Sequence, residues 1–125
     1  MTNPIKVLVV DDNVDAATSA ADLLELAGCV TRVCHDGPAA LAEARKFSPD
    51  VCVLDVTMPG MDGTELAERL RQDASHPMRL IALTGLWDIT ATHRTRNAGF
   101  DLHLTKSADP ERLVEAVLGH KLETV

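Results

Sequence analysis

Five polar side chains stand directly after four short apolar runs of the sequence, and their types suit phosphoryl chemistry. Asp11 and Asp12 follow the first run, Asp55 follows a later one, and Thr84 and Lys106 each follow one more. Short apolar runs are typical of buried strands, so these side chains are expected at strand ends. If the strands are parallel, their carboxyl ends share one edge of the sheet, and all five groups meet there.

Three clustered carboxylates repel one another, and a hard divalent cation relieves this repulsion. Mg²⁺ prefers oxygen ligands and keeps several waters, so two or three carboxylates with one backbone carbonyl are sufficient. A carboxylate beside such a cation can attack phosphorus and form an aspartyl phosphate. Asp55 is the candidate nucleophile because it ends the central strand, and Asp11 and Asp12 are expected to hold the metal. The Lys106 ammonium and the Thr84 hydroxyl could bind the other phosphoryl oxygens.

Strands and helices alternate in the elements that must position these groups. Strands are predicted at 5–10, 29–34, 51–54, 80–83 and 102–105. Helical spacing of apolar residues predicts helices between them, including 65–71, a weaker one at 89–98 and a last one capped by Asp109 and Pro110. In the first helix, Val14, Ala17, Ala21 and Leu24 fall at helical spacing. This alternation predicts an α/β fold, a doubly wound parallel five-stranded sheet of order 2-1-3-4-5.

Length and composition further limit the classes of protein to which this chain can belong. A chain of 125 residues can bury one hydrophobic core, and it shows no linker or repeat, so a single domain over residues 1–125 is expected. Its 19 acidic and 12 basic residues give a net charge of −7, which argues against nucleic acid and membrane surfaces as partners. No apolar run approaches a membrane span, and no signal-peptide pattern is present. Three cysteines, an odd number, fit a reducing cytoplasm better than a disulfide framework.

Four segments carry a combined pattern: VLVVDDN at 7–13, LDVTMPGMDG at 54–63, ALTG at 82–85 and GFDLHLTK at 99–106. Together they resemble the receiver domain of two-component response regulators, over almost the whole chain. The resemblance implies the flavodoxin-like receiver fold. It also implies that Asp55 is the phosphoacceptor and that Asp11, Asp12, Asp55 and the backbone carbonyl of Thr57 bind Mg²⁺.

The same resemblance implies phosphoryl contacts and a switch. Thr84 and Lys106 would bind the phosphoryl group, and Thr84 would reorient together with His103 on the last strand. Two positions depart from the family pattern. His103 stands where Tyr or Phe is usual, which could make the switch sensitive to pH. Ser107 stands where Pro is usual, often after a cis peptide bond.

The implied function is that of a phosphoacceptor domain in a two-component phosphorelay. A histidine kinase or a histidine phosphotransfer protein would donate the phosphoryl group. A surface made of the fourth helix, the fifth strand and the last helix would then bind a downstream protein. Such a domain, free-standing or part of a hybrid sensor kinase, catalyses only its own phosphorylation and dephosphorylation, and it is not an enzyme acting on a separate substrate.

Three alternatives use similar residues or the same fold. A Mg²⁺-dependent phosphatase of the haloacid-dehalogenase type usually carries a general-acid Asp two residues after the nucleophile, where this chain has Thr57. A flavodoxin-like cofactor binder would need a glycine-rich phosphate loop, and DDNVD at 11–15 stands in its place. The third is a receiver-like module that binds partners without phosphorylation, which the unusual Ser107 and His103 keep open.

Overall fold

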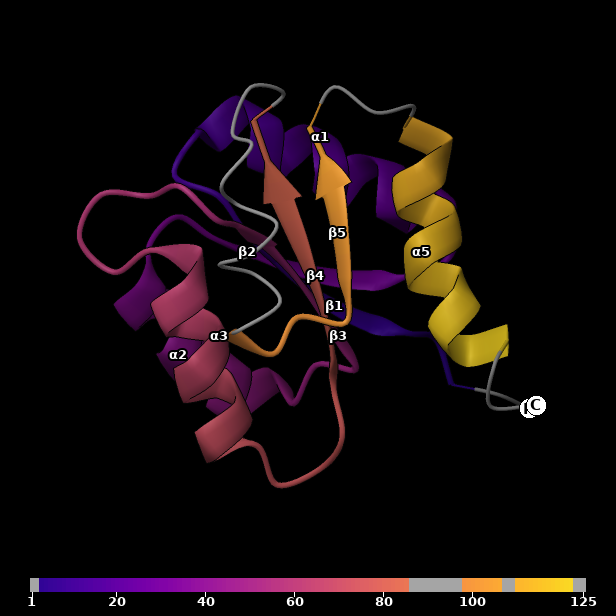
Figure 1. The fold of residues 1–125 in the computed structure, drawn as a ribbon. Helices are drawn as coiled ribbons and strands as arrows, with labels where there is room; N and C mark the ends of the chain where they lie inside the picture. Colours follow the sequence, from indigo (N-terminus) through magenta and orange to yellow (C-terminus); the bar gives the residue numbers. More distant parts are fainter. Residues whose placement is uncertain (1–2, 86–97, 107–109, 123–125) are drawn as a thin grey trace.

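The computed structural model describes residues 3–85, 98–106 and 110–122, in which five parallel strands form one sheet (Figure 1). The strand order β2-β1-β3-β4-β5 confirms the predicted doubly wound α/β fold. The helix predicted at 89–98 lies outside the described residues, apart from Ala98. The strands are β1 (Lys6–Val10), β2 (Val30–Cys34), β3 (Val51–Asp55), β4 (Arg79–Thr84) and β5 (Leu102–Thr105), and the helices are α1 (Val14–Leu26), α2 (Gly37–Phe47), α3 (Gly63–Asp73) and α5 (Pro110–Leu122).

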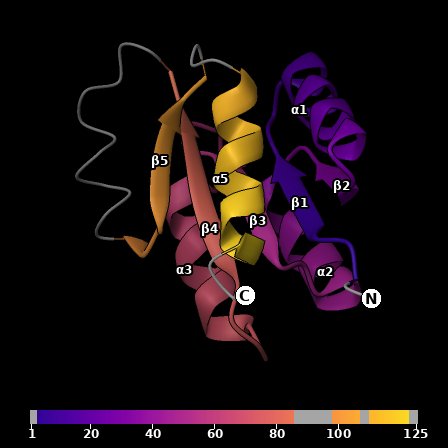
Figure 2. The same cartoon turned by 90° about the vertical axis from the view of Figure 1, so that its right-hand side faces the viewer.

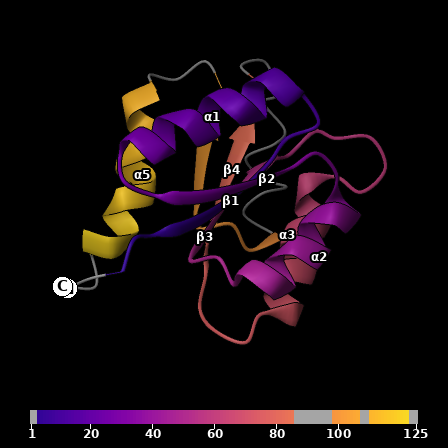
Figure 3. The ribbon, with the colours of Figure 1, turned by 180° about the vertical axis from the view of Figure 1, so that it is seen from behind.

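Helices cover both faces of the sheet. In Figures 2 and 3, α1 and α5 lie on one face, while α2 and α3 lie on the other. Successive strand residues point to opposite faces, so the central strands must be apolar throughout, and all five residues of β3 are buried. One core contains Val7, Val9, Val53, Leu24 and Val117, and the other contains Leu8, Leu54, Leu66, Leu70 and Leu80.

The first three helices each begin at a side-chain cap. Asn13, Asp36 and Asp62 accept hydrogen bonds from backbone amides of the first turn of α1, α2 and α3. The Asp62 cap starts α3 at Gly63, two residues before the predicted start. Among the described residues, no helix has the length and apolar character needed to cross a membrane.

Val14 departs from the buried stripe of α1. The other residues at this helical spacing, Ala17, Ala21 and Leu24, are buried, but Val14 is 57% exposed. Val14 is the first residue of the helix and follows the exposed cap Asn13. The buried stripe therefore begins one turn into α1, where the helix reaches the sheet.

β2 forms one edge of the sheet and pairs with β1 alone among the described strands. Its Val30 and Val33 are 38% and 36% exposed. Between them, Arg32 places its guanidinium 4.8 Å from the centre of the Phe47 ring on α2. The edge strand therefore combines partly exposed valines with a stacked cation.

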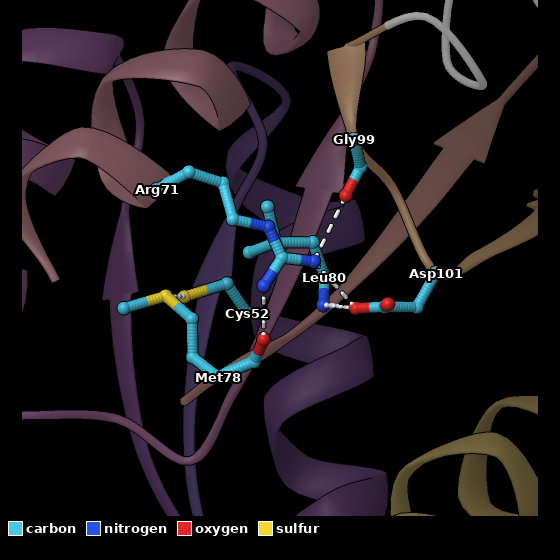
Figure 4. Close-up of polar contacts among 6 residues, drawn as sticks. All are labelled: Cys52, Arg71, Met78, Leu80, Gly99 and Asp101. Carbon is cyan, nitrogen blue, oxygen red and sulfur yellow. Dashed lines mark hydrogen bonds and ion pairs between the residues drawn. The ribbon is translucent and has the colours of Figure 1, made fainter. Parts of the chain in front are cut away.

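Arg71 of α3 fastens the amino-terminal ends of β4 and β5 (Figure 4). Its Nη1 donates to the carbonyl oxygen of Met78 at 2.6 Å, and its Nη2 donates to the carbonyl oxygen of Gly99 at 2.8 Å. The same Nη2 lies 2.7 Å from Oδ2 of Asp101, which also accepts the backbone amide of Leu80 at 2.8 Å. This Arg71 clamp fixes the point at which the chain enters β5.

The three cysteines are free and buried, as expected for small apolar residues. Cys34 and Cys52 lie in strands, and Cys29 comes directly before β2. Burial raises the pKa of the Cys52 thiol to about 12. Thiols in such an environment are unreactive at neutral pH.

Candidate functional site

Three carboxylates meet at the carboxyl edge of the sheet, toward which the arrowheads of β4 and β5 point in Figure 1. Asp55 ends β3, and Asp11 and Asp12 directly follow β1, its neighbour in the sheet. One oxygen of each carboxylate lies within 4.8 Å of the others. Asp11 and Asp55 are buried, each 3% exposed, while Asp12 is exposed. The predicted convergence of these three residues is therefore present.

The backbone holds the two buried carboxylates in place. Oδ1 of Asp11 accepts the amide of Asn13 at 3.0 Å, and Oδ1 of Asp55 accepts the amide of Thr57 at 3.2 Å. Gly63, at the start of α3, packs against the main chain after β3, because a Cβ there would overlap the carbonyl oxygen of Asp55. Glycine is thus required where α3 approaches this strand end.

Lys106 connects the two buried carboxylates. Its Nζ lies 2.8 Å from Oδ2 of Asp11 and 3.3 Å from Oδ2 of Asp55. Its backbone amide donates to the carbonyl oxygen of Thr84 at 2.8 Å, which sets the lysine at the end of β5. Although partial burial acts in the opposite direction, the hydrogen bonds and negative charges of Asp11 and Asp55 raise the pKa of Lys106. The ammonium is therefore held as a permanent positive charge.

The single positive charge of Lys106 does not neutralise the three carboxylates. Burial, and then the charge of Asp11, raises the pKa of Asp55 to about 7, although Lys106 acts to lower it. The negative charge at this strand end is thus incompletely compensated. A second cation with hard oxygen ligands would relieve it, and the carboxylate oxygens of Asp11, Asp12 and Asp55 are a donor set that suits Mg²⁺. Thr57, the fourth predicted ligand, is exposed and adjacent to this cluster.

Thr84 and His103, predicted as the switch, are in direct contact. Thr84 ends β4 and is 1% exposed, and its Oγ1 lies 2.6 Å from Nε2 of His103 on β5. The register of the two strands pairs Ala82 with His103 and Thr84 with Thr105. His103 therefore lies opposite the β4 residue that precedes Thr84 by two positions. The sequence predicted both residues but not the hydrogen bond between them.

His35 was not predicted at this site, but it lies beside Asp11. Its Nδ1 lies 3.0 Å from the backbone carbonyl oxygen of Asp11. The signal was available, because His35 follows β2 just as Asp11 follows β1, and the parallel register pairs Val10 with Cys34. By contrast, the Lys106–Ser107 peptide bond and the predicted fourth helix lie outside the described residues.

Comparison with known proteins agrees with this fold. The profile of the response regulator receiver domain matches residues 7–118. The transcriptional regulatory protein TrcR of Mycobacterium tuberculosis is 33% identical over 117 residues, covering 94% of this chain and 45% of TrcR. The DNA-binding response regulator MtrA of Mycobacterium leprae is 33% identical over 112 residues, covering 90% of this chain and 49% of MtrA. This chain therefore spans about half the length of these regulators.

Solved structures give the same result. The receiver domain of the Francisella response regulator 1452 has a TM-score of 0.85 and 32% identity, over 98% of this chain and 100% of that one. The chemotaxis protein CheY4 of Vibrio cholerae has a TM-score of 0.85 and 29% identity, over 94% of this chain and 98% of that one. Because the profile covers most of the sequence and both sets of relatives agree with it, the chain belongs to the response regulator receiver domain family of two-component signalling.

Proposed function

We propose that Asp55 accepts a phosphoryl group from the phosphohistidine of a histidine kinase or a histidine phosphotransfer protein. The observation that supports this most strongly is the placement of Asp55, buried at the end of β3 beside Asp11 and 3.3 Å from the Lys106 ammonium. A buried carboxylate with a fixed cation at hydrogen-bond range is suited to nucleophilic attack on phosphorus.

The transfer has a simple balance of bonds. A carboxylate oxygen of Asp55 forms a bond to phosphorus while the phosphorus–nitrogen bond of the donor breaks. The donor imidazole leaves with that electron pair and takes up a proton. Lys106 holds one outer oxygen of the phosphoryl group by its charge, and the Thr84 hydroxyl binds another by a hydrogen bond.

Asp11, Asp12, Asp55 and the backbone carbonyl of Thr57 would hold Mg²⁺ at this site. When bound, the ion supplies the positive charge that the cluster lacks and neutralises charge on the phosphoryl oxygens. The protein's own part is to fix these ligands at one edge of the sheet. Asn13 and Thr57 contribute through the backbone amides that bind the carboxylates of Asp11 and Asp55.

Phosphorylation then reorients Thr84 and His103, and this changes the affinity of a protein-binding surface. This surface includes β5 and α5, with the segment predicted as the fourth helix. With a net charge of −7, the domain is suited to protein partners in the cytoplasm more than to nucleic acid or membrane. In this role it catalyses only its own phosphorylation and dephosphorylation. The names of TrcR and MtrA describe whole regulators, of which this chain corresponds to about half.

Intact-protein mass spectrometry with acetyl phosphate and Mg²⁺ tests the proposal. The parent should gain one phosphoryl group, and the gain should disappear in Asp55→Asn and when EDTA removes the metal. Asp22→Asn is the matched control, because Asp22 is an exposed carboxylate on α1. If the parent gains nothing from acetyl phosphate or from a phosphorylated histidine kinase, the domain is a binding module that works without phosphorylation. A gain that persists in Asp55→Asn would place the acceptor elsewhere.

A further inference from the structure

A single hydrogen atom lies between the hydroxyl of Thr84 and the imidazole of His103. Their Oγ1 and Nε2 atoms are 2.6 Å apart, a short distance for a hydrogen bond between oxygen and nitrogen. Thr84 is almost fully buried, and the pairing of β4 with β5 fixes both backbones. The contact is therefore set by the sheet itself.

Two arrangements of hydrogen satisfy this contact. If Nε2 carries no proton, the hydroxyl donates to it and uses its one hydrogen. If Nε2 carries a proton, the ring donates to Oγ1, and the hydroxyl hydrogen remains for another acceptor. A doubly protonated imidazolium permits the second arrangement alone.

These arrangements differ in what Thr84 offers to a phosphoryl group on Asp55. A phosphoryl oxygen is an acceptor, so it needs the hydroxyl hydrogen. In the first arrangement the hydroxyl donates that hydrogen to Nε2 of His103, and this hydrogen bond must break before Thr84 can turn. In the second arrangement the hydrogen is already available, and the imidazolium adds a positive charge on the same side.

We propose that His103 is a positioning residue whose protonation releases the Thr84 hydroxyl to the phosphoryl group, so that acidification favours the phosphorylated domain. The inference rests on the proposed function, because it requires a phosphoryl group on Asp55. Histidine is the side chain that ordinarily changes charge between about pH 5 and 8. The phenol or phenyl ring usual at this position in the family keeps one charge state over that range.

The charged groups around His103 are consistent with such a role. Asp101 directly precedes β5, two residues before His103, and its charge is paired with Arg71 of α3 (Figure 4). The neighbouring β4 residue, Ala82, is uncharged. Beyond the strand ends lie Lys106 and Asp55, which are paired with each other. α5 packs on the opposite face, against Leu102 and Leu104. Among the described residues, the charged groups on these neighbouring elements are therefore held in ion pairs.

The first test compares pH profiles of phosphorylation. The parent and His103→Gln are brought to steady state with acetyl phosphate and Mg²⁺ between about pH 5.5 and 8.5, and phosphorylated and unphosphorylated protein are quantified by mass. Gln carries a permanent amide donor that can replace protonated Nε2. Dividing the parent's ratio by that of His103→Gln at each pH cancels the effects of pH on the donor, the metal and Asp55.

The quotient should be near one at low pH and fall about fivefold by high pH, the change that corresponds to a hydrogen bond of about 1 kcal/mol. In a Thr84→Ala background, His103→Gln should produce no pH-dependent effect, because the hydroxyl is gone. A merely structural role of His103 would alter stability but would leave the quotient flat.

The second test needs no substitution. Nitrogen NMR follows the titration of the His103 imidazole in the parent, and beryllofluoride, a phosphoryl mimic, should shift that titration upward. By reciprocity, a fivefold coupling corresponds to an upward shift of about 0.7 pH unit. If the parent is phosphorylated but the quotient is flat and the ring titration does not move, this inference is wrong and the proposed function stands. If the parent takes no phosphoryl group at any pH, the proposed function fails, and this inference fails with it.

Discussion

Asp55→Asn is expected to stabilise the metal-free protein at alkaline pH, although it removes the phosphoacceptor. Burial and the neighbouring Asp11 raise the pKa of Asp55 from 3.8 to about 7 in the folded protein. Between these two pH values the folded state retains a proton that the unfolded chain has already lost. The free energy of unfolding therefore falls as pH rises through this interval.

The magnitude follows from the same pKa values. Asp55 contributes its full share of stability below its unfolded pKa of 3.8 and loses about 1.4 kcal/mol per pH unit up to about 7. The interval of about three units corresponds to about 4 kcal/mol. Asparagine is neutral at every pH and avoids this loss, but Lys106 gives up one carboxylate partner. We therefore expect a net gain of about 2–4 kcal/mol at alkaline pH and almost none near pH 4.

Urea unfolding followed by circular dichroism, at about pH 4.5 and 8 in EDTA, measures this difference. Asp22→Asn, an exposed carboxylate on α1, is the control and should change stability equally little at both pH values. Added Mg²⁺ should stabilise the parent, because a ligand of the folded state raises the free energy of unfolding. The same addition should stabilise Asp55→Asn much less.

The reasoning is refuted if Asp55→Asn is less stable than the parent at pH 8 in EDTA. It is also refuted if the two proteins lose stability in parallel as pH rises. Either result would mean that Lys106 and the surrounding amides already compensate the cluster. The site would then have little need of a divalent cation, and the proposed Mg²⁺ ligands would lose their main physical support.

Three further predictions test separate parts of the structure. Lys106→Met should reduce phosphorylation by acetyl phosphate at least about tenfold, because the fixed positive charge at the phosphoryl group is lost; unchanged labelling would contradict that role. Gly63→Ala should lower the free energy of unfolding by about 1–3 kcal/mol, since its Cβ overlaps a backbone carbonyl. The control is Gly119→Ala, which has open space for a Cβ and should raise the free energy of unfolding by up to about 1 kcal/mol. Equal effects of the two substitutions in urea unfolding would exclude the close packing of Gly63 against the end of β3. Arg71→Met should lower the free energy of unfolding by about 1–3 kcal/mol. A double-mutant cycle with Asp101→Asn should show coupling between the two residues, and additive effects would argue against the Arg71 clamp.

The sequence was sufficient for the sheet and for the placement of the site. Alternating apolar runs and helical periods predict a parallel sheet, and of the common orders for such a sheet 2-1-3-4-5 suits five strands. The shared direction of the strands then brings Asp11, Asp55 and Lys106 to one edge. These inferences succeed because they depend on the direction of parallel strands and not on side-chain detail. The packing of Gly63 against the end of β3 needed the backbone path, which no residue pattern encodes.

Other features depend on three-dimensional detail that periodicity does not carry. Val14 fits the helical stripe by spacing, but its exposure depends on how far the first turn of α1 extends past the core. The bond between Thr84 and His103 depends on the β4–β5 register, in which an offset of one residue would separate them. His35 could not be assigned to the site from the sequence, because one histidine after a strand is uninformative until the neighbouring strand is known.

The exposed edge formed by β2 bears on self-association. An unpaired strand edge can recruit the same edge of another molecule, and partly exposed Val30 and Val33 would favour this. Arg32 stands at the middle of this five-residue strand. A second copy centred antiparallel on β2 would place two Arg32 side chains opposite each other, and like charges in that position are destabilising. Arg32 would also leave its place over Phe47 if it moved away to avoid its counterpart. We therefore expect Arg32 to disfavour this edge-to-edge pairing of two copies.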